Sequence, residues 1–100
     1  MDVFEALADH TRRQIVELVA TGEMSAGDIA GRFEVSRPAV SRHLRVLRET
    51  GLLQARGDAQ RRLYRLDPGA LDELATWIER TRGFWSGRLT ALDRHLEASE

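Results

Sequence analysis

The stretch SRPAVSRHLRVLRETGLL, residues 36–53, combines an apolar stripe with a row of arginines. Val40, Leu44 and Leu47 recur at intervals of four and three, which places them on one face of an α-helix. The opposite face carries polar and basic side chains: Arg37, Ser41, Arg42, Arg45 and Arg48. Because the apolar stripe must be buried, the basic face is predicted to point outward.

The bounds of this helix are also indicated by the sequence. Ser36 is suited to cap its start, and Pro38 falls in the first turn, where its missing N–H does no harm. Gly51 predicts the end of the helix.

The formal net charge of −1 conceals a strongly uneven distribution. Residues 36–65 contain eight arginines and two acids, whereas residues 1–35 have a net charge of −4 and residues 66–100 one of −3. All fifteen basic residues are arginine. Such asymmetry suggests a polyanionic partner for the middle third. The alternative is an ordinary solvated charged surface.

A short helix is predicted before the basic one and a hairpin after it. Ser25 and Asp28 form an S-x-x-D start, with Ile29, Ala30 and Phe33 facing inward. Leu52 to Arg56 and Arg62 to Leu66 are predicted to be strands joined by a loop at 57–60. Residues 25–50 then form a helix-turn-helix, and residues 52–66 form a basic wing.

Helices are predicted at both ends of the chain. Residues 1–21 are expected to form helix, with Asp9 capping its second segment. Asp67 and Pro68 start an amphipathic helix over 68–97, either continuous or broken near Gly83 or Gly87. The fold is therefore predicted to be mainly α with a small β-hairpin. It is a single winged helix-turn-helix domain over 1–100, with about five helices.

Several classes of function are disfavoured by the composition. There is no cysteine for disulfides or thiolate metal sites, and no apolar run long enough to span a bilayer. The N-terminal residues lack a basic leader and an apolar core, so a cytoplasmic location is expected. His10, His43 and His95 are isolated, and no nucleophile motif or phosphate-binding loop occurs. We therefore expect no enzyme activity, no cofactor and no membrane partner.

A helix-turn-helix with a basic wing is suited to double-stranded DNA, because the second helix fits the major groove. Arg37 and Arg42 are the candidates for guanine, and Arg45 for phosphate. Ser36 and Ser41 can hold a phosphate or a base edge, and Pro38 and Ala39 can contact a thymine methyl. The wing arginines suit the backbone or a minor groove. The predicted DNA-binding residues are Ser36, Arg37, Pro38, Ala39, Ser41, Arg42, Arg45, Arg56, Arg61 and Arg62.

Two residues of the helix keep a structural alternative. Arg48 either faces DNA or forms a surface ion pair, for example with Glu49. His43 lies beside Leu44, at the expected edge of the core, so a hydrogen bond within the protein competes with contact to DNA.

Three separate motifs resemble the ArsR/SmtB family of bacterial winged-helix repressors. Residues 36–52 look like the family's recognition helix, and residues 7–15, LADHTRRQI, are similar to its N-terminal LADPTRRxIL stretch. Residues 61–68, RRLYRLDP, resemble its second wing strand and the following helix start. The resemblance implies a homodimeric repressor that binds an inverted-repeat operator.

The metal sites known in this family are not matched. Residues 23–29, EMSAGDI, stand where thiolate-sensing members carry cysteines, and Asp93 with His95 is only half of the other site type. No metal site is therefore expected. The tail FWSGRLTAL, residues 84–92, resembles a metal-independent subgroup. Whether a small-molecule effector exists is open.

The terminal helices carry a stripe of large apolar residues, which is typical of a core or a dimer interface, with a ligand pocket as the alternative. Pairing with a second copy would bury this stripe and set two recognition helices about one DNA turn apart. A winged helix used only for protein–protein contact is a further alternative, but it needs no paired basic elements. The predicted interface residues are Val3, Phe4, Leu7, Leu74, Trp77, Ile78, Trp85, Leu89 and Leu92.

Overall fold

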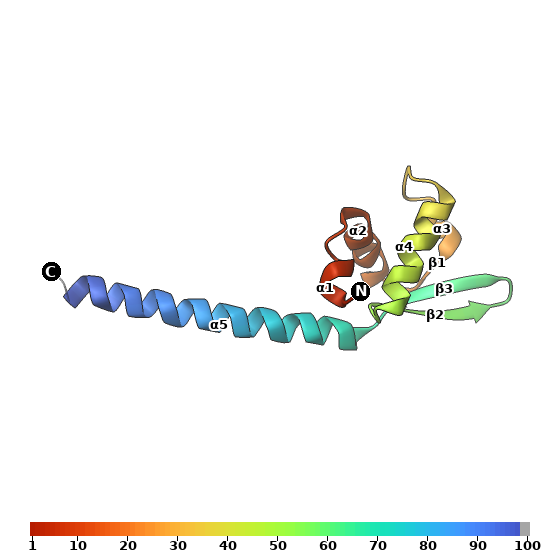
Figure 1. Cartoon of the computed structure of the whole chain (residues 1–100). Helices are drawn as coiled ribbons and strands as arrows, with labels where there is room; N and C mark the ends of the chain where they lie inside the picture. Colours follow the sequence, from red (N-terminus) through yellow and green to blue (C-terminus); the bar gives the residue numbers. More distant parts are fainter. Residues whose placement is uncertain (99–100) are drawn as a thin grey trace.

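The computed structural model describes residues 1–98, with side chains up to residue 88. Its helices are α1 (Val3–Ala6), α2 (His10–Ala20), α3 (Ala26–Ala30), α4 (Arg37–Glu49) and α5 (Pro68–Ala98). Its strands are β1 (Met24–Ser25), β2 (Leu53–Asp58) and β3 (Arg61–Leu66), in the antiparallel order β1-β3-β2. The predicted winged helix-turn-helix with five helices is confirmed. In Figure 1, α1–α4 and the sheet form a body from which α5 projects.

Side-chain caps determine where the helices begin. Asp9, Ser25 and Ser36 each accept a hydrogen bond from the backbone N–H three residues on, at 3.0, 3.1 and 3.3 Å. Such caps contribute about 1 kcal/mol each to helix stability. At the other end of α4, Gly51 has a φ of 87°, the left-handed conformation that terminates a helix. These predicted caps are confirmed.

The apolar stripe of α4 forms the centre of the core. Val40, Leu44 and Leu47 are at most 2% exposed. They belong to one buried cluster with residues of α1, α2, α3 and the sheet, among them Ile15, Ile29, Leu52 and Leu53. Full burial of one such side chain stabilises the fold by about 1.5–3 kcal/mol. The core therefore determines which face of α4 is left in solvent.

The hairpin is longer and tighter than the sequence predicted. β2 and β3 pair as far as Asp58 and Arg61, so the turn contains only Ala59 and Gln60 instead of the predicted loop over 57–60. The prediction failed because Asp58 and Arg61 close the hairpin with an ion pair at 2.9 Å, which sequence spacing alone does not reveal. Ala59 accommodates the turn with a φ of 56°.

A third strand, β1, was not predicted. Met24 pairs with Tyr64 and Ser25 with Leu63, which makes β3 the central strand of the sheet. Leu63 is 8% exposed, and its cross-strand neighbours are Ser25 and Arg56. Pairing on both sides explains the burial of Leu63, for which the sequence offered no cover.

α5 is one continuous helix that passes through Gly83 and Gly87. Its start is anchored by Asp67, whose carboxylate accepts hydrogen bonds from the Gln54 amide and the Gly69 N–H, both at 2.9 Å. These two bonds lower the pKa of Asp67 below its ordinary value. The helix packs against α1 through Phe4 and Trp77, whose rings meet edge to face at 5.3 Å. Within the described residues, no helix is long and apolar enough to cross a bilayer.

Candidate nucleic-acid interface

The outward face of α4 carries an uninterrupted set of basic and hydroxyl side chains. Arg37, Arg42, Arg45 and Arg48 are all exposed, as are Ser36, Pro38 and Ser41, whereas Ala39 is half-buried. Within the described part of the chain, these four arginines form no ion pair. The buried stripe on the opposite face holds the helix rigidly against the core. The guanidinium groups are therefore available to an external anion.

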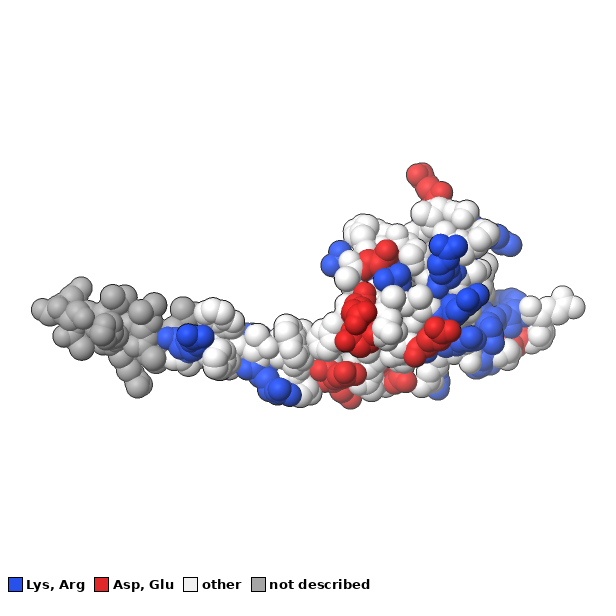
Figure 2. Space-filling model, in the orientation of Figure 1, with Lys and Arg blue, Asp and Glu red and all other residues white. Residues whose placement is uncertain are grey.

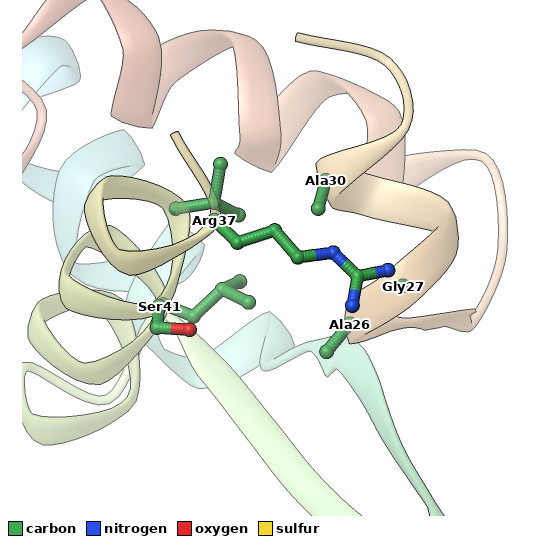
Figure 3. A pocket seen from close by; sticks show the side chains of 7 residues that line it. Ala26, Gly27, Ala30, Arg37 and Ser41 are labelled. Carbon is green, nitrogen blue, oxygen red and sulfur yellow. The ribbon is translucent and has the colours of Figure 1, made fainter. Parts of the chain in front are cut away.

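Arg37 lies at the junction of the two helices of the helix-turn-helix. Figure 3 shows its side chain extending from α4 across the gap to α3, beside Ala26 and Gly27. A Cβ atom built on Gly27 would lie 3.9 Å from a terminal nitrogen of Arg37. Ser41 lines the same small pocket, one turn further along α4. The start of α4 thus presents both a cation and a hydroxyl group.

The wing arginines are held differently. Arg56 of β2 donates two hydrogen bonds to the Glu23 carboxylate, at 2.8 and 3.0 Å. The Arg56 guanidinium lowers the pKa of Glu23, mainly by hydrogen bonding, and the carboxylate raises the pKa of Arg56 in turn. Arg61 is paired with Asp58 across the turn. Two of the three predicted wing contacts therefore have a partner within the protein.

Glu23 itself was missed by the sequence analysis. It immediately precedes β1, and the pairing of β1 with β3 brings it to the edge of the sheet near Arg56. A two-residue strand has no detectable periodicity, so only an isolated acid before a basic wing was available as a signal.

His43 is used within the protein. Its Nδ1 atom lies 3.4 Å from a terminal nitrogen of Arg12 on α2, and it is half-buried. The Nε atom of Arg12 also donates to the Ala6 carbonyl at 2.7 Å. Of the two alternatives for His43, the structure favours the contact within the protein, which links α4 to α2 and α1. Nearby, the pKa of Asp9 is lowered, chiefly by the Arg12 backbone N–H and also by the charges of His43 and Arg12.

Charge is segregated over the surface of the body. On the face shown in Figure 2, basic side chains gather over α4 and the sheet, while acidic ones gather where α5 leaves the body. This arrangement matches the sequence, in which residues 36–65 hold the excess of arginine. Such a field attracts a polyanion and orients it toward α4.

The residues predicted for a dimer interface fall into three groups. Val3 is 4% exposed and belongs to the core of its own protomer, because α1 packs directly on α4, so we place it in the core rather than the interface. Leu7 and Leu74 are half-buried at the edge of that core. The remaining described members are substantially exposed, at 37% for Phe4, 50% for Trp77, 45% for Ile78 and 56% for Trp85. The side chains of Leu89 and Leu92 lie outside the described residues.

No cluster of three or more potential metal ligands occurs among the described residues. The side chains of Asp93 and His95, the half-pattern noted in the sequence, fall outside that set.

Comparison with known proteins identifies the family. The sequence model described as "Bacterial regulatory protein, arsR family" matches residues 9–55. The chain is 47% identical to "HTH-type transcriptional regulator Rv2034" of Mycobacterium tuberculosis, covering 87% of this chain and 78% of that protein. The chain belongs to the arsR family. Like these relatives, this arsR-family member is a DNA-binding transcriptional regulator and not an enzyme.

Two further relatives of this arsR-family protein are informative. It is 36% identical to "Transcriptional repressor SdpR" of Bacillus subtilis, covering 77% of this chain and 86% of that protein. Its fold is similar to the homodimeric winged helix-turn-helix DNA-binding domain of Mb0332 from Mycobacterium bovis. That match has a TM-score of 0.66 and 30% identity, and it covers 80% of this chain and 75% of the other.

Proposed function

We propose that this arsR-family protein is a homodimeric repressor that binds an inverted-repeat operator and does not respond to metal. The observation that carries the proposal is the outer face of α4. Four exposed arginines without acidic partners lie on a helix whose other face is at most 2% exposed at each anchoring residue. A rigid helix of this kind fits the major groove of B-DNA.

The position of each residue along α4 supports a division of tasks. Arg37 and Arg42 lie in its first half, where a recognition helix reaches base edges, and each can bind the O6 and N7 atoms of a guanine. Arg45 lies one turn further along and is assigned to a phosphate. Ser36 and Ser41 contribute hydroxyl groups, and Pro38 and Ala39 offer apolar contact to a thymine methyl.

The α5 helix supports the dimer. Its exposed aromatic and aliphatic side chains, with Phe4 of α1, form an apolar strip on an element that projects from the body (Figure 1). An isolated projecting helix gains little from intrinsic propensity and is stabilised by packing of its apolar face. A second copy would cover the strip and carry a second α4. The homodimeric Mb0332 domain, with its similar fold, is consistent with this.

Repression and the absence of metal response rest on two further observations. The SdpR protein, which this chain covers over most of its length, is named a transcriptional repressor. The chain has no cysteine, so the thiolate chemistry that selects soft metal ions is not available to it.

The function is tested by selecting fragments of the source genome on the purified protein. We expect recovered fragments to share an inverted repeat, affinity to fall steeply with salt, and binding to be unaffected by chelators or added Zn²⁺. A promoter carrying the repeat should be silenced by the protein in a reporter strain. Failure to enrich any repeat would overturn the operator, and activation of the reporter would overturn repression.

The dimer is tested with Trp85→Ala. Sedimentation at fixed concentration should show a wild-type dimer and a variant shifted toward monomer, because a large exposed aromatic group is lost from the strip. Arg82→Ala, an exposed residue of the same helix, serves as the control and should remain dimeric. An unchanged Trp85→Ala dimer would contradict the assigned interface.

A further inference from the structure

A cleft separates the second half of α4 from the wing. Its volume is about 220 Å³, and it is lined by Ser41, Leu44, Arg45 and Arg48 of α4, Arg62 and Tyr64 of β3, and Ala26. Three of these residues are arginines and none is acidic. The cleft is distinct from the small pocket at the start of α4, where Arg37 lies.

Two periodicities bring these side chains together. Ser41, Arg45 and Arg48 are spaced by four and three residues, so they lie on one face of α4. Arg62 and Tyr64 are two apart on β3, so they lie on the same face of the sheet. Leu44 contributes to the lining and is itself 2% exposed. The walls of the cleft are therefore built on a rigid helix and the central strand.

Tyr64 provides an unused hydrogen-bond donor. The residue is 7% exposed and belongs to the core cluster, yet its hydroxyl forms no hydrogen bond with any described residue. No sealed-off polar side-chain atom lacks a partner among the described residues. The hydroxyl must therefore remain accessible to solvent, and the cleft is the space that Tyr64 lines.

The cations of the cleft are also unused. Arg45, Arg48 and Arg62 form no ion pair with described residues, in contrast to Arg56 and Arg61 elsewhere on the wing. An exposed set of three guanidinium groups without a counter-charge, next to a free phenol, has the donors that a phosphate oxygen accepts.

We propose that this cleft holds a backbone phosphate of the DNA, with Arg48 and Arg62 on either side and the Tyr64 hydroxyl donating from below. The inference rests on the proposed function, since Ser41 and Arg45 belong both to the cleft and to the outer face of α4. It assigns Arg48 to DNA, adds Tyr64 to the contacts, and divides α4 into a base-reading first half and a phosphate-anchored second half. Phosphate contacts of this kind set register and depth without sequence preference.

The test uses the full-length protein, a random-sequence duplex and a duplex selected from the source genome. Tyr64→Phe removes only the hydroxyl, so we expect an affinity loss of about tenfold on both duplexes with an unchanged salt slope. Arg48→Gln and Arg62→Gln should each reduce the slope of log affinity against log salt by about one per bound protomer. Arg82→Gln on α5 is the charge-matched control and should change neither quantity.

The melting temperature and dimer fraction of Tyr64→Phe separate a lost contact from a damaged core, and both should match the wild type. Wild-type affinity of Tyr64→Phe on both duplexes would overturn the cleft. So would an affinity loss confined to the selected duplex. If the wild-type protein binds neither duplex, the proposed function itself fails. If the wild type binds while the cleft variants keep its salt slope, only the cleft fails.

Discussion

The arginines of α4 and those of the wing differ in what surrounds them. Arg37, Arg42, Arg45 and Arg48 have no acidic partner among the described residues, whereas Arg56 and Arg61 are held by Glu23 and Asp58 at 2.8 and 2.9 Å. The excess of positive charge over residues 36–65 is therefore not uniform. α4 keeps its cations for an external anion, while the wing uses two of its own to stabilise its shape.

This difference follows from the position of the acids in the fold. Asp58 lies on the wing, and Glu23 is brought to the wing by β1, but no acid is brought to the outer face of α4. A paired arginine must give up its carboxylate before it can bind phosphate, so the two groups should contribute unequally to DNA binding. Four substitutions test this comparison.

Leu47→Ala should have the largest effect, because it removes the inner anchor of α4. Leu47 is fully buried, and such truncations cost about 2–5 kcal/mol of unfolding free energy. Chemical denaturation at fixed protein concentration provides the measurement. Arg45→Ala, an exposed control on the same helix, should remain within about 0.5 kcal/mol of the wild type. Equal stability of the two variants would show that α4 is not held by its apolar stripe.

Arg42→Ala should weaken operator binding by roughly 1–3 kcal/mol and relax base preference, because an unpaired recognition-helix arginine is lost. Arg61→Ala is the comparison on the wing, and its smaller loss should be the same on operator and random DNA. Titration of both duplexes at one salt concentration measures the two effects. A uniform loss for Arg42→Ala would instead make it a phosphate contact.

Ala59→Gly should stabilise the wing. A non-glycine residue at a φ of 56° is strained by about 1–2 kcal/mol, and glycine relieves this at an entropic cost of about 0.5–1 kcal/mol. We therefore expect a gain of about 0.5–1 kcal/mol in thermal or chemical unfolding. Gln60→Gly is the matched control, since φ is not positive at Gln60, and it should give no gain. Loss of stability in Ala59→Gly would contradict the turn geometry.

Glu23→Gln should have the smallest effect on stability, because its ion pair with Arg56 is exposed. The pKa of Glu23 is lowered by Arg56. Its contribution is therefore complete above the ordinary carboxylate pKa and is lost as pH falls through the lowered value. The variant should lose less stability than the wild type on acidification, and it should bind random DNA more tightly because Arg56 is released. Weaker binding would show that Glu23 positions Arg56 for DNA.

The parts of the fold that the sequence predicted are those with local signals. The helix α4, its cap at Ser36, its stop at Gly51 and the caps at Asp9 and Ser25 are all in the structure, because apolar periodicity and capping residues act over a few neighbouring positions. The exposure of Arg37 and Arg42 followed from the same periodicity. The family resemblance then indicated how these elements assemble.

What only the tertiary structure decided depends on contacts between residues distant in the chain. The pairing of β1 with β3, the ion pair between Glu23 and Arg56, and the cleft between α4 and the wing each join segments at least sixteen residues apart. The burial of Val3 within its own protomer is of the same kind. A local pattern specifies which face of an element is apolar or charged, but which other face it meets depends on the packing of the whole core.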